Sequence, residues 1–329
     1  MDFEIFRPVL AKALKRADPS RGGRPGFDPV LKFKMLVLQT MHGLSLEPTE
    51  FLVRDRLSWM RFCGLGLGEA VPDANTLWDF REALIAAKAL ERLFVCLDQA
   101  INKAGYTPMV GQIVDAELVA APKQRNRQDE KDAIKAGRGS EDWRDEPAKL
   151  RQKDRDARWT VKFAKARERE DGARPIDIAI TVFGYKNHVS IDRRHGLIRK
   201  HLTTDAAAHD RARLRERLID KTNLASDLWA DTAYRSKQNE VFLANNGMTS
   251  RIHRKKPKNR AMPAHIKRGA ANRSAVRAAV EHVFGRPEAG GAPLIRTLGL
   301  KRAEAAITLA DMAYHMRRWS WRDRQGAPA

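Results

Sequence analysis

Cysteine is scarce in this chain of 329 residues, and its scarcity excludes several kinds of site. The two cysteines, Cys63 and Cys96, lie 33 residues apart (96 − 63), without a CxxC pair or a histidine cluster that has the spacing of zinc ligands. We therefore expect two buried, reduced thiols, and neither a disulfide framework nor a zinc centre.

Long hydrophobic runs are missing as well. No apolar segment approaches the roughly 18 residues that cross a bilayer. The N-terminus has an early acid instead of the apolar core of a signal peptide. The sequence predicts a protein that has no membrane segment and stays in the cytoplasm.

Acidic residues are few relative to basic ones. The chain has 62 Lys and Arg against 41 Asp and Glu, which gives a formal net charge of +21. A charge of this size predicts a polyanionic partner, and nucleic acid is the first candidate. The base composition of the coding DNA can also produce an arginine- and alanine-rich protein, so the positions of the charges have to decide. With 43% hydrophobic residues, the chain can bury a full core.

Residues 1–105 contain the start and stop signals of helices. A helix is predicted over 30–41, after Asp28 and before the stop at Gly43, and further helical patterns cover 46–62 and 77–102. These segments predict a small all-α domain. Helices separated by short turns, with arginines between apolar positions, fit a DNA-binding helix-turn-helix or a dimerisation module, and the sequence does not separate the two.

Beyond residue 105 the pattern changes to short apolar runs that end on acids. Val110, Ile113 and Val114 lead to Asp115, and residues 228–230 lead to Asp231. Open α/β sheets place their chemistry outside strand ends, so these two carboxylates are candidates for one site. The alternative for each is an Asp that simply closes a strand with a turn or helix cap.

A third acid, Glu281, lies on a helix predicted over 272–284, four residues after Arg277. The alternative is an exposed ion pair within this helix, worth only about 0.3–0.5 kcal/mol. If Asp115, Asp231 and Glu281 converge, three hard oxygen donors suit Mg²⁺ or Mn²⁺ rather than zinc. Two such ions per site are the usual arrangement for phosphodiester chemistry.

Basic residues follow both predicted strands. Residues 251–268 contain eight Lys and Arg and no acid, which favours contact with phosphate over a solvated loop of mixed charge. Residues 124–172 are charge-mixed and poor in apolar residues, and are predicted to leave the core as partial helix or disorder. The predicted DNA-binding residues are Lys123, Arg125, Lys186, His188, Tyr234, Arg235, Arg254, Lys255, Lys256 and Arg277. For Lys186 and His188, plain exposure on an alternating strand is the alternative.

Four segments carry a resemblance to a known family. They read VDAELVAAPKQRN (114–126), FGYKNHV (183–189), WADTAYRS (229–236) and VEHVF (280–284). In this order and spacing they resemble the motifs of bacterial insertion-sequence transposases of the DDE type, with the insertion-sequence-five family as the nearest match. The three acids of that family fall on Asp115, Asp231 and Glu281.

The resemblance implies an α/β fold, with a ribonuclease-H-like mixed-sheet catalytic domain over 106–325 after the N-terminal helical domain over 1–105. It also implies a homodimer that binds double-stranded DNA at terminal inverted repeats and target sites. Metal-dependent DNA cleavage and strand transfer in the bacterial nucleoid would be its activity.

Two positions depart from the family pattern. Arg277 matches the arginine four residues before the last acid, but Ser274 replaces a tyrosine and Glu288 replaces a lysine. An acid in the lysine position substitutes a like charge for a phosphate contact. The alternatives are therefore a catalytically impaired, transposase-derived DNA-binding protein and a ribonuclease-H-like nuclease.

Overall fold

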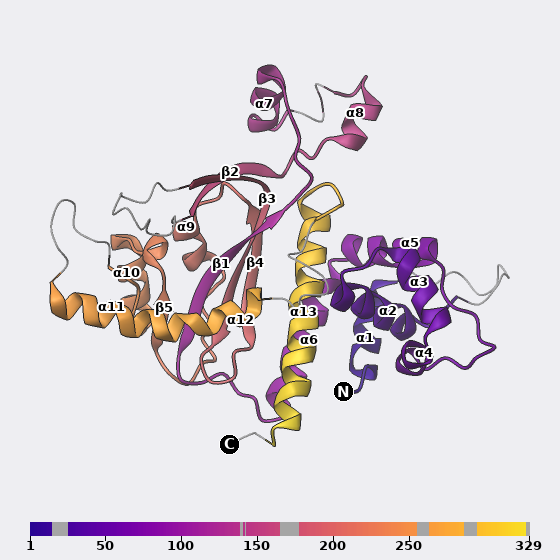
Figure 1. Cartoon of the computed structure of the whole chain (residues 1–329), viewed down its shortest axis with the longest axis horizontal. Helices are drawn as coiled ribbons and strands as arrows, with labels where there is room; N and C mark the ends of the chain where they lie inside the picture. The colour runs from indigo at the N-terminus through magenta and orange to yellow at the C-terminus, as the bar shows by residue number, and fades with distance from the viewer. Residues whose placement is uncertain are drawn as a thin grey trace, which may run out of the picture.

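The computed structural model describes residues 1–14, 26–138, 141, 143–164, 178–254, 263–285 and 295–326. These residues form a mixed α/β structure in which one sheet lies beside a group of N-terminal helices (Figure 1). The helices of the N-terminal part are α1 (Arg7–Ala13), α2 (Pro29–His42), α3 (Leu46–Asp55), α4 (Leu57–Cys63), α5 (Ala74–Ala86) and α6 (Ala89–Lys103).

Local capping explains where these helices begin and end. The Asp28 carboxylate accepts hydrogen bonds from the backbone of Val30 and Leu31 at the start of α2, and Gly43 ends that helix with φ 63°. The predicted helix over 30–41 is thus confirmed. The longer pattern over 46–62 divides at Arg56 into α3 and α4, and the pattern over 77–102 divides at Lys88 (φ 48°) into α5 and α6.

The sheet is built on two long strands. β1 (Gln112–Ala120) pairs antiparallel with β3 (Ile178–Asp192), which also pairs antiparallel with β2 (Arg158–Ala164) and β4 (Ile198–Asp205). On its other edge β1 pairs parallel with β5 (Asp227–Ala230), and β5 pairs parallel with β6 (Thr249–Ser250). The sheet is therefore mixed, and its parallel part places the end of β5 beside the middle of β1.

Further helices surround this sheet. Between β1 and β2 lie α7 (Gln128–Lys135) and α8 (Pro147–Gln152), which project beyond the ends of β2 and β3 (Figure 1). After β4 come α9 (Asp210–Glu216), the short 3₁₀ helix η3 (Thr232–Tyr234), α10 (Lys237–Asn245), α11 (Ala264–Arg277), the 3₁₀ turn η4 (Ala278–Val280), α12 (Glu281–Phe284) and α13 (Leu300–Arg324). Helix α11 packs against β5, and η4 packs against β1.

Helix α13 joins the two halves of the protein. It stands between the sheet and the N-terminal helices (Figure 1), and packs on α2 and α6 on one side and on β4 on the other. One continuous hydrophobic core includes Phe33 and Leu97 from the helices, Ile191 from the sheet and Met312 from α13. The core therefore runs across the boundary predicted at residue 105, and that boundary stays a prediction. Although α13 has 25 residues, no helix in the described part of the chain is both long and apolar enough to span a membrane.

Buried polar contacts fix the same junction. Arg199 on β4 is 4% exposed and donates hydrogen bonds to Asp192, Asp98 and Asn102, so a guanidinium connects the sheet to α6. Such a buried charge is tolerated because its donors are paired.

Two neutral histidines are buried in the interface of β4, α6 and α13. His201 and His315 both lie against the ring of Phe94, at centroid distances of 4.5 and 5.1 Å. Burial lowers the pKa of His201 to about 4 and the pKa of His315 to about 3, and the charge of Arg199 also lowers the latter. Asp311 on α13 lies 3.9 Å from Nδ1 of His201.

These histidines predict a loss of stability in acid. The unfolded chain binds their protons near pH 6.5, whereas the folded chain binds them only near pH 4 or below. The two neutral histidines then make their full contribution to the free energy of unfolding above pH 6.5. As the pH drops toward 4, this free energy falls by about 1.4 kcal/mol per pH unit for each histidine. Urea unfolding across this range should show a shallower loss for His315→Leu. His209→Gln, at an exposed histidine, should follow the wild type; equal pH slopes for His315→Leu and wild type would contradict the assignment.

Candidate active site

Asp115 and Asp231 lie side by side at one edge of the sheet. In the parallel pairing of β1 and β5, Val114 is opposite Ala230, and each of the two acids follows directly along its own strand. The carboxylate of Asp231 also accepts a hydrogen bond of 2.7 Å from the backbone of Ala233 and so caps η3. The capping alternative is therefore correct for Asp231, and it coexists with a position next to Asp115.

The proximity of the two acids affects the pKa of Asp231. Burial raises the pKa of Asp231 above its ordinary value, and the negative charge of Asp115 raises it further. The hydrogen bond from Ala233 and the positive charge of Arg277 lower it. Two carboxylates in a shared, partly desolvated site repel each other, and such a site attracts a cation.

Glu281 is placed differently from the other two acids. It begins α12, and its side chain is exposed. Arg277, expected to face Glu281 within one helix, instead donates from Nη2 to Oδ2 of Asp115 at 2.7 Å. Within the described ranges, no group of three or more His, Cys, Asp or Glu side chains has the geometry to hold a metal ion. The structure thus brings Asp115 and Asp231 together and leaves Glu281 outside a three-acid cluster.

Two residues beside the acid pair were assigned differently or not at all from sequence. Tyr234 is 1% exposed, and its hydroxyl has no hydrogen-bond partner among the described residues. Burial and the negative charges of Asp210, Asp115 and Asp231 raise the pKa of Tyr234 well above its ordinary value. Asp210 begins α9 and adds a third negative charge near Asp231. Asp210 was not among the predicted site residues, because an acid in the first turn of a helix is common.

The polar side chains of the segment 183–189 make hydrogen bonds within the chain. The Tyr185 hydroxyl donates to Asp154 at 2.6 Å, and Asn187 donates to Asp311 of α13 at 2.9 Å. Lys186 donates to Asp210 at 2.9 Å. Nε2 of His188 lies 2.9 Å from the Thr204 hydroxyl.

Three of the predicted DNA contacts are buried or have partners within the chain. His188 is fully buried, and burial lowers its pKa to about 4, so a neutral ring is enclosed by the sheet. Tyr234 is buried too, and faces the acids instead of the exterior. Lys186 is half-buried, and its charge is taken up by Asp210. A surface phosphate cannot reach the first two residues.

Other basic residues gather beside the acid pair. Arg273 lies one helical turn before Arg277 on α11; burial lowers its pKa, and the positive charges of Arg254, Arg235 and Arg251 lower it further. We call Arg235, Arg251, Arg254 and Arg273 the arginine cluster. Arg235 also donates to the backbone oxygen of Ile252, and Arg251 pairs with Asp227 at 2.8 Å. Arg251 and Arg273 were not among the predicted contacts, although Arg251 belongs to the acid-free run.

Four predicted DNA contacts remain, of which the structure describes two. Lys123 and Arg125 are exposed in the segment that follows β1. Lys255 and Lys256 lie outside the described residues.

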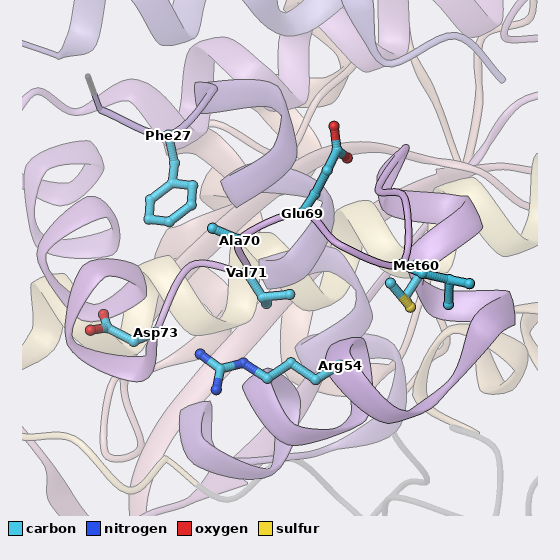
Figure 2. Close-up of a pocket in the computed structure, with 8 residues that line it drawn as sticks. Phe27, Arg54, Met60, Glu69, Ala70, Val71 and Asp73 are labelled. Atoms are coloured by element: carbon cyan, nitrogen blue, oxygen red, sulfur yellow. The ribbon is translucent and has the colours of Figure 1, made fainter. Parts of the chain in front are cut away.

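A pocket lies elsewhere, among the N-terminal helices (Figure 2). Its lining includes Phe27, Met60 and Val71, together with Arg54, Glu69 and Asp73. Arg54 is already paired with Glu50 at 2.8 Å. Two carboxylates against one neutralised guanidinium do not suit a polyanion, so this pocket is no candidate for DNA.

The fold and the acid pair define a class of protein: a mixed-sheet protein with carboxylates at a strand edge and arginines beside them. Comparison with known families agrees. Residues 1–83 match the family model described as transposase domain (DUF772), and residues 106–316 match the one described as transposase DDE domain. The second match covers 211 residues (316 − 106 + 1) of 329, so the chain belongs to the family of DDE transposases, a class of DNA-cleaving and strand-transferring enzymes. No solved structure matches the chain.

At Gly184, β3 approaches the backbone of β1 too closely for a larger residue, which predicts an effect on stability. Gly184 has φ 155°, and a Cβ there would lie 2.2 Å from the backbone oxygen of Val119 on β1. Gly184→Ala should therefore destabilise the protein by about 3 kcal/mol or more, because backbone must move. Gly247→Ala is the matched control, since φ is 68° there but nothing lies within 4 Å, and should cost only about 1–2 kcal/mol. Chemical denaturation measures both, and a neutral Gly184→Ala would contradict the close approach.

Proposed function

We propose that this protein is the DNA transposase of a bacterial insertion sequence, of the insertion-sequence-five type, and that it acts on the terminal inverted repeats of its element. The observation that carries the proposal is the adjacency of Asp115 and Asp231 beside the arginine cluster, in a chain of the DDE family. The reaction would be DNA cleavage followed by strand transfer into a target duplex.

The strand order supports a ribonuclease-H-like catalytic fold. Along the sheet the order β4-β3-β1-β5-β6 has three antiparallel strands followed by two strands parallel to β1. In this arrangement the first acid lies within the central strand and the second lies at the end of its parallel neighbour. Strand β2 extends the sheet beyond this set by pairing with the first half of β3.

The donor set fits a hard divalent cation in part. Asp115 and Asp231 offer adjacent carboxylates, and burial, together with the charge of Asp115, raises the pKa of Asp231. Mg²⁺ or Mn²⁺, two ions in the proposal, would be held by these acids with Glu281 as the third, and would activate the attacking oxygen and stabilise the leaving one. In the chain alone, Glu281 still has to approach the other two.

The chain's own residues would position the DNA. The arginine cluster offers fixed positive charge next to the acids, so phosphates on either side of the scissile bond would be neutralised there. Lys123 and Arg125 extend the basic surface beyond β1.

Partners and location follow from this proposal. Double-stranded DNA is the substrate, and a homodimer would hold two element ends in the bacterial nucleoid. Phe51, Leu57 and Leu67 are large apolar side chains exposed by 63%, 68% and 82% on the N-terminal helices and the loop after them. If these side chains form one patch, that patch would favour a protein partner for the N-terminal helices.

Asp231→Asn tests the assignment directly. With Mg²⁺ and a duplex bearing the element's ends, the wild type should release 3′-hydroxyl ends, and the variant should lose cleavage at least about a hundredfold. Asn keeps the acceptor oxygen that caps η3, so the fold should survive. The matched control is Asp227→Asn on the same strand, whose carboxylate pairs with Arg251 at the surface. Cleavage by Asp231→Asn at the wild-type rate would refute the site.

Other outcomes identify the other candidates. Binding to the element's ends without any cleavage would favour a catalytically impaired, transposase-derived DNA-binding protein. The observation behind this candidate is Glu288 in the lysine position of the family, in a segment outside the described residues. Cleavage of branched or hybrid substrates whatever their terminal sequence would favour a ribonuclease-H-like nuclease.

The arginine cluster predicts a steep dependence of DNA binding on salt. Each phosphate contact contributes about −0.9 to the slope of log K against log salt concentration. Arg254→Gln combined with Arg273→Gln should reduce the steepness by about 2. Arg324→Gln, at the exposed end of α13, should leave the slope unchanged. Fluorescence anisotropy over a salt series measures the slopes, and a flat response of the wild type would contradict phosphate contact.

A further inference from the structure

The carboxylate of Asp115 is fully engaged by the chain itself. Its Oδ2 accepts from Nη2 of Arg277 at 2.7 Å, and its Oδ1 accepts from the backbone of Ala116 at 2.9 Å. The two charged side chains are only 22% and 16% exposed. A half-buried, charge-assisted contact of this length is among the stronger polar interactions in proteins. A cation that binds Oδ2 would therefore compete with the guanidinium for the same negative charge.

Arg277 is only partly satisfied in this position. Its Nε is buried and has no hydrogen-bond partner among the described residues. The Arg277 side chain as a whole keeps 22% of its surface exposed. A phosphate oxygen could contact this exposed part of its planar guanidinium. The arginine cluster lies close by, because Arg273 is one turn earlier on the same helix. DNA drawn to the cluster would bring phosphates within reach of Arg277.

The helix changes its geometry directly after Arg277. Helix α11 ends there, η4 follows as a 3₁₀ turn, and α12 begins at Glu281. A 3₁₀ stretch inside a helical segment often marks a hinge. Val280 and Val283 are buried and anchor the segment, while Glu281 is exposed. Arg277, which contacts Asp115, and Glu281, the third proposed metal ligand, thus lie on either side of the 3₁₀ turn η4.

We propose that the ion pair between Arg277 and Asp115 is an autoinhibitory latch, in which the guanidinium occupies the carboxylate that a divalent cation needs until DNA phosphate draws it away. This inference rests on the proposed function, because it assigns metal binding to Asp115. Its consequence is thermodynamic linkage: DNA raises the affinity for the metal, and the metal raises the affinity for DNA by the same factor. Without DNA the acids stay closed to the ion, and unprogrammed cleavage is suppressed.

Mn²⁺ binding to the full-length, DNA-free protein tests the latch without relying on activity. Electron paramagnetic resonance of free Mn²⁺ gives the affinity of wild type and variants. Arg277→Gln should bind Mn²⁺ about five- to tenfold more tightly, because its competitor is gone. Arg273→Gln is the matched control: it removes one positive charge from the same helix but no contact with Asp115, and should gain less than about twofold.

The same measurement separates the latch from the site on which it depends. Asp115→Asn should weaken Mn²⁺ binding in both the wild-type and the Arg277→Gln background, which places the gain at Asp115. If Asp115→Asn weakens binding but Arg277→Gln brings no gain, or no more than Arg273→Gln, the latch is refuted and the metal site stands. If Asp115→Asn changes nothing, the metal site of the proposed function is refuted and the latch with it.

A second measurement covers the possibility that Arg277→Gln disturbs the fold. A duplex of about 20 base pairs and arbitrary sequence supplies phosphates without element ends. After subtraction of Mn²⁺ bound by the duplex alone, it should tighten Mn²⁺ binding by wild type about five- to tenfold, and this increase should be smaller in Arg277→Gln. An unchanged Mn²⁺ affinity of the wild type with saturating duplex would overturn the latch.

Discussion

The parallel pairing of β1 with β5 is the constraint on which the site depends. Three residue pairs, from Gln112 opposite Leu228 to Val114 opposite Ala230, fix the register. Asp115 and Asp231 come next along these strands, so they emerge together at one edge. Ile113, Val114, Leu228 and Ala230 are fully buried, and a slip by one residue would turn these side chains to the opposite face. The packing of the core thus determines the distance between the acids.

Helix α13 extends the same constraint to the rest of the chain. It covers β4 and contacts α2 and α6, and its Asp311 accepts hydrogen bonds from Asn187 in the middle of β3. Because Arg199 ties the sheet to α6 as well, the N-terminal helices and the sheet share one interior. The family models divide the sequence into two segments, but the hydrophobic core does not follow that division. A disturbance in the N-terminal helices can therefore reach the sheet through α13.

The sequence predicted local features well and tertiary partners poorly. The apolar run before Asp231 identified the end of β5, and Asp28 identified the start of α2, because these signals act within a few residues. The run before Asp115 identified a strand but not its end, since β1 continues to Ala120. Burial of His188 and Tyr234 was missed because distant residues on β4 and the acid pair surround them, and a polar residue in an alternating strand gives no sign of this. For the same reason the spacing of Arg277 and Glu281 indicated a pair within one helix, whereas Arg277 meets an acid 162 residues away in sequence.

Charge balance explains why an acidic site can exist within a chain of net charge +21. Asp115, Asp231 and Asp210 lie near one another, and each would raise the free energy of the others if nothing opposed it. Lys186 compensates Asp210, and Arg277 compensates Asp115, while Asp231 keeps a raised pKa. The protein therefore supplies its own cations beside these acids, and one of them, Arg277, lies where α11 gives way to the 3₁₀ turn η4. If DNA draws Arg277 away, as proposed above, the contact that stabilises Asp115 in the chain alone would also be the one that controls access of a metal ion.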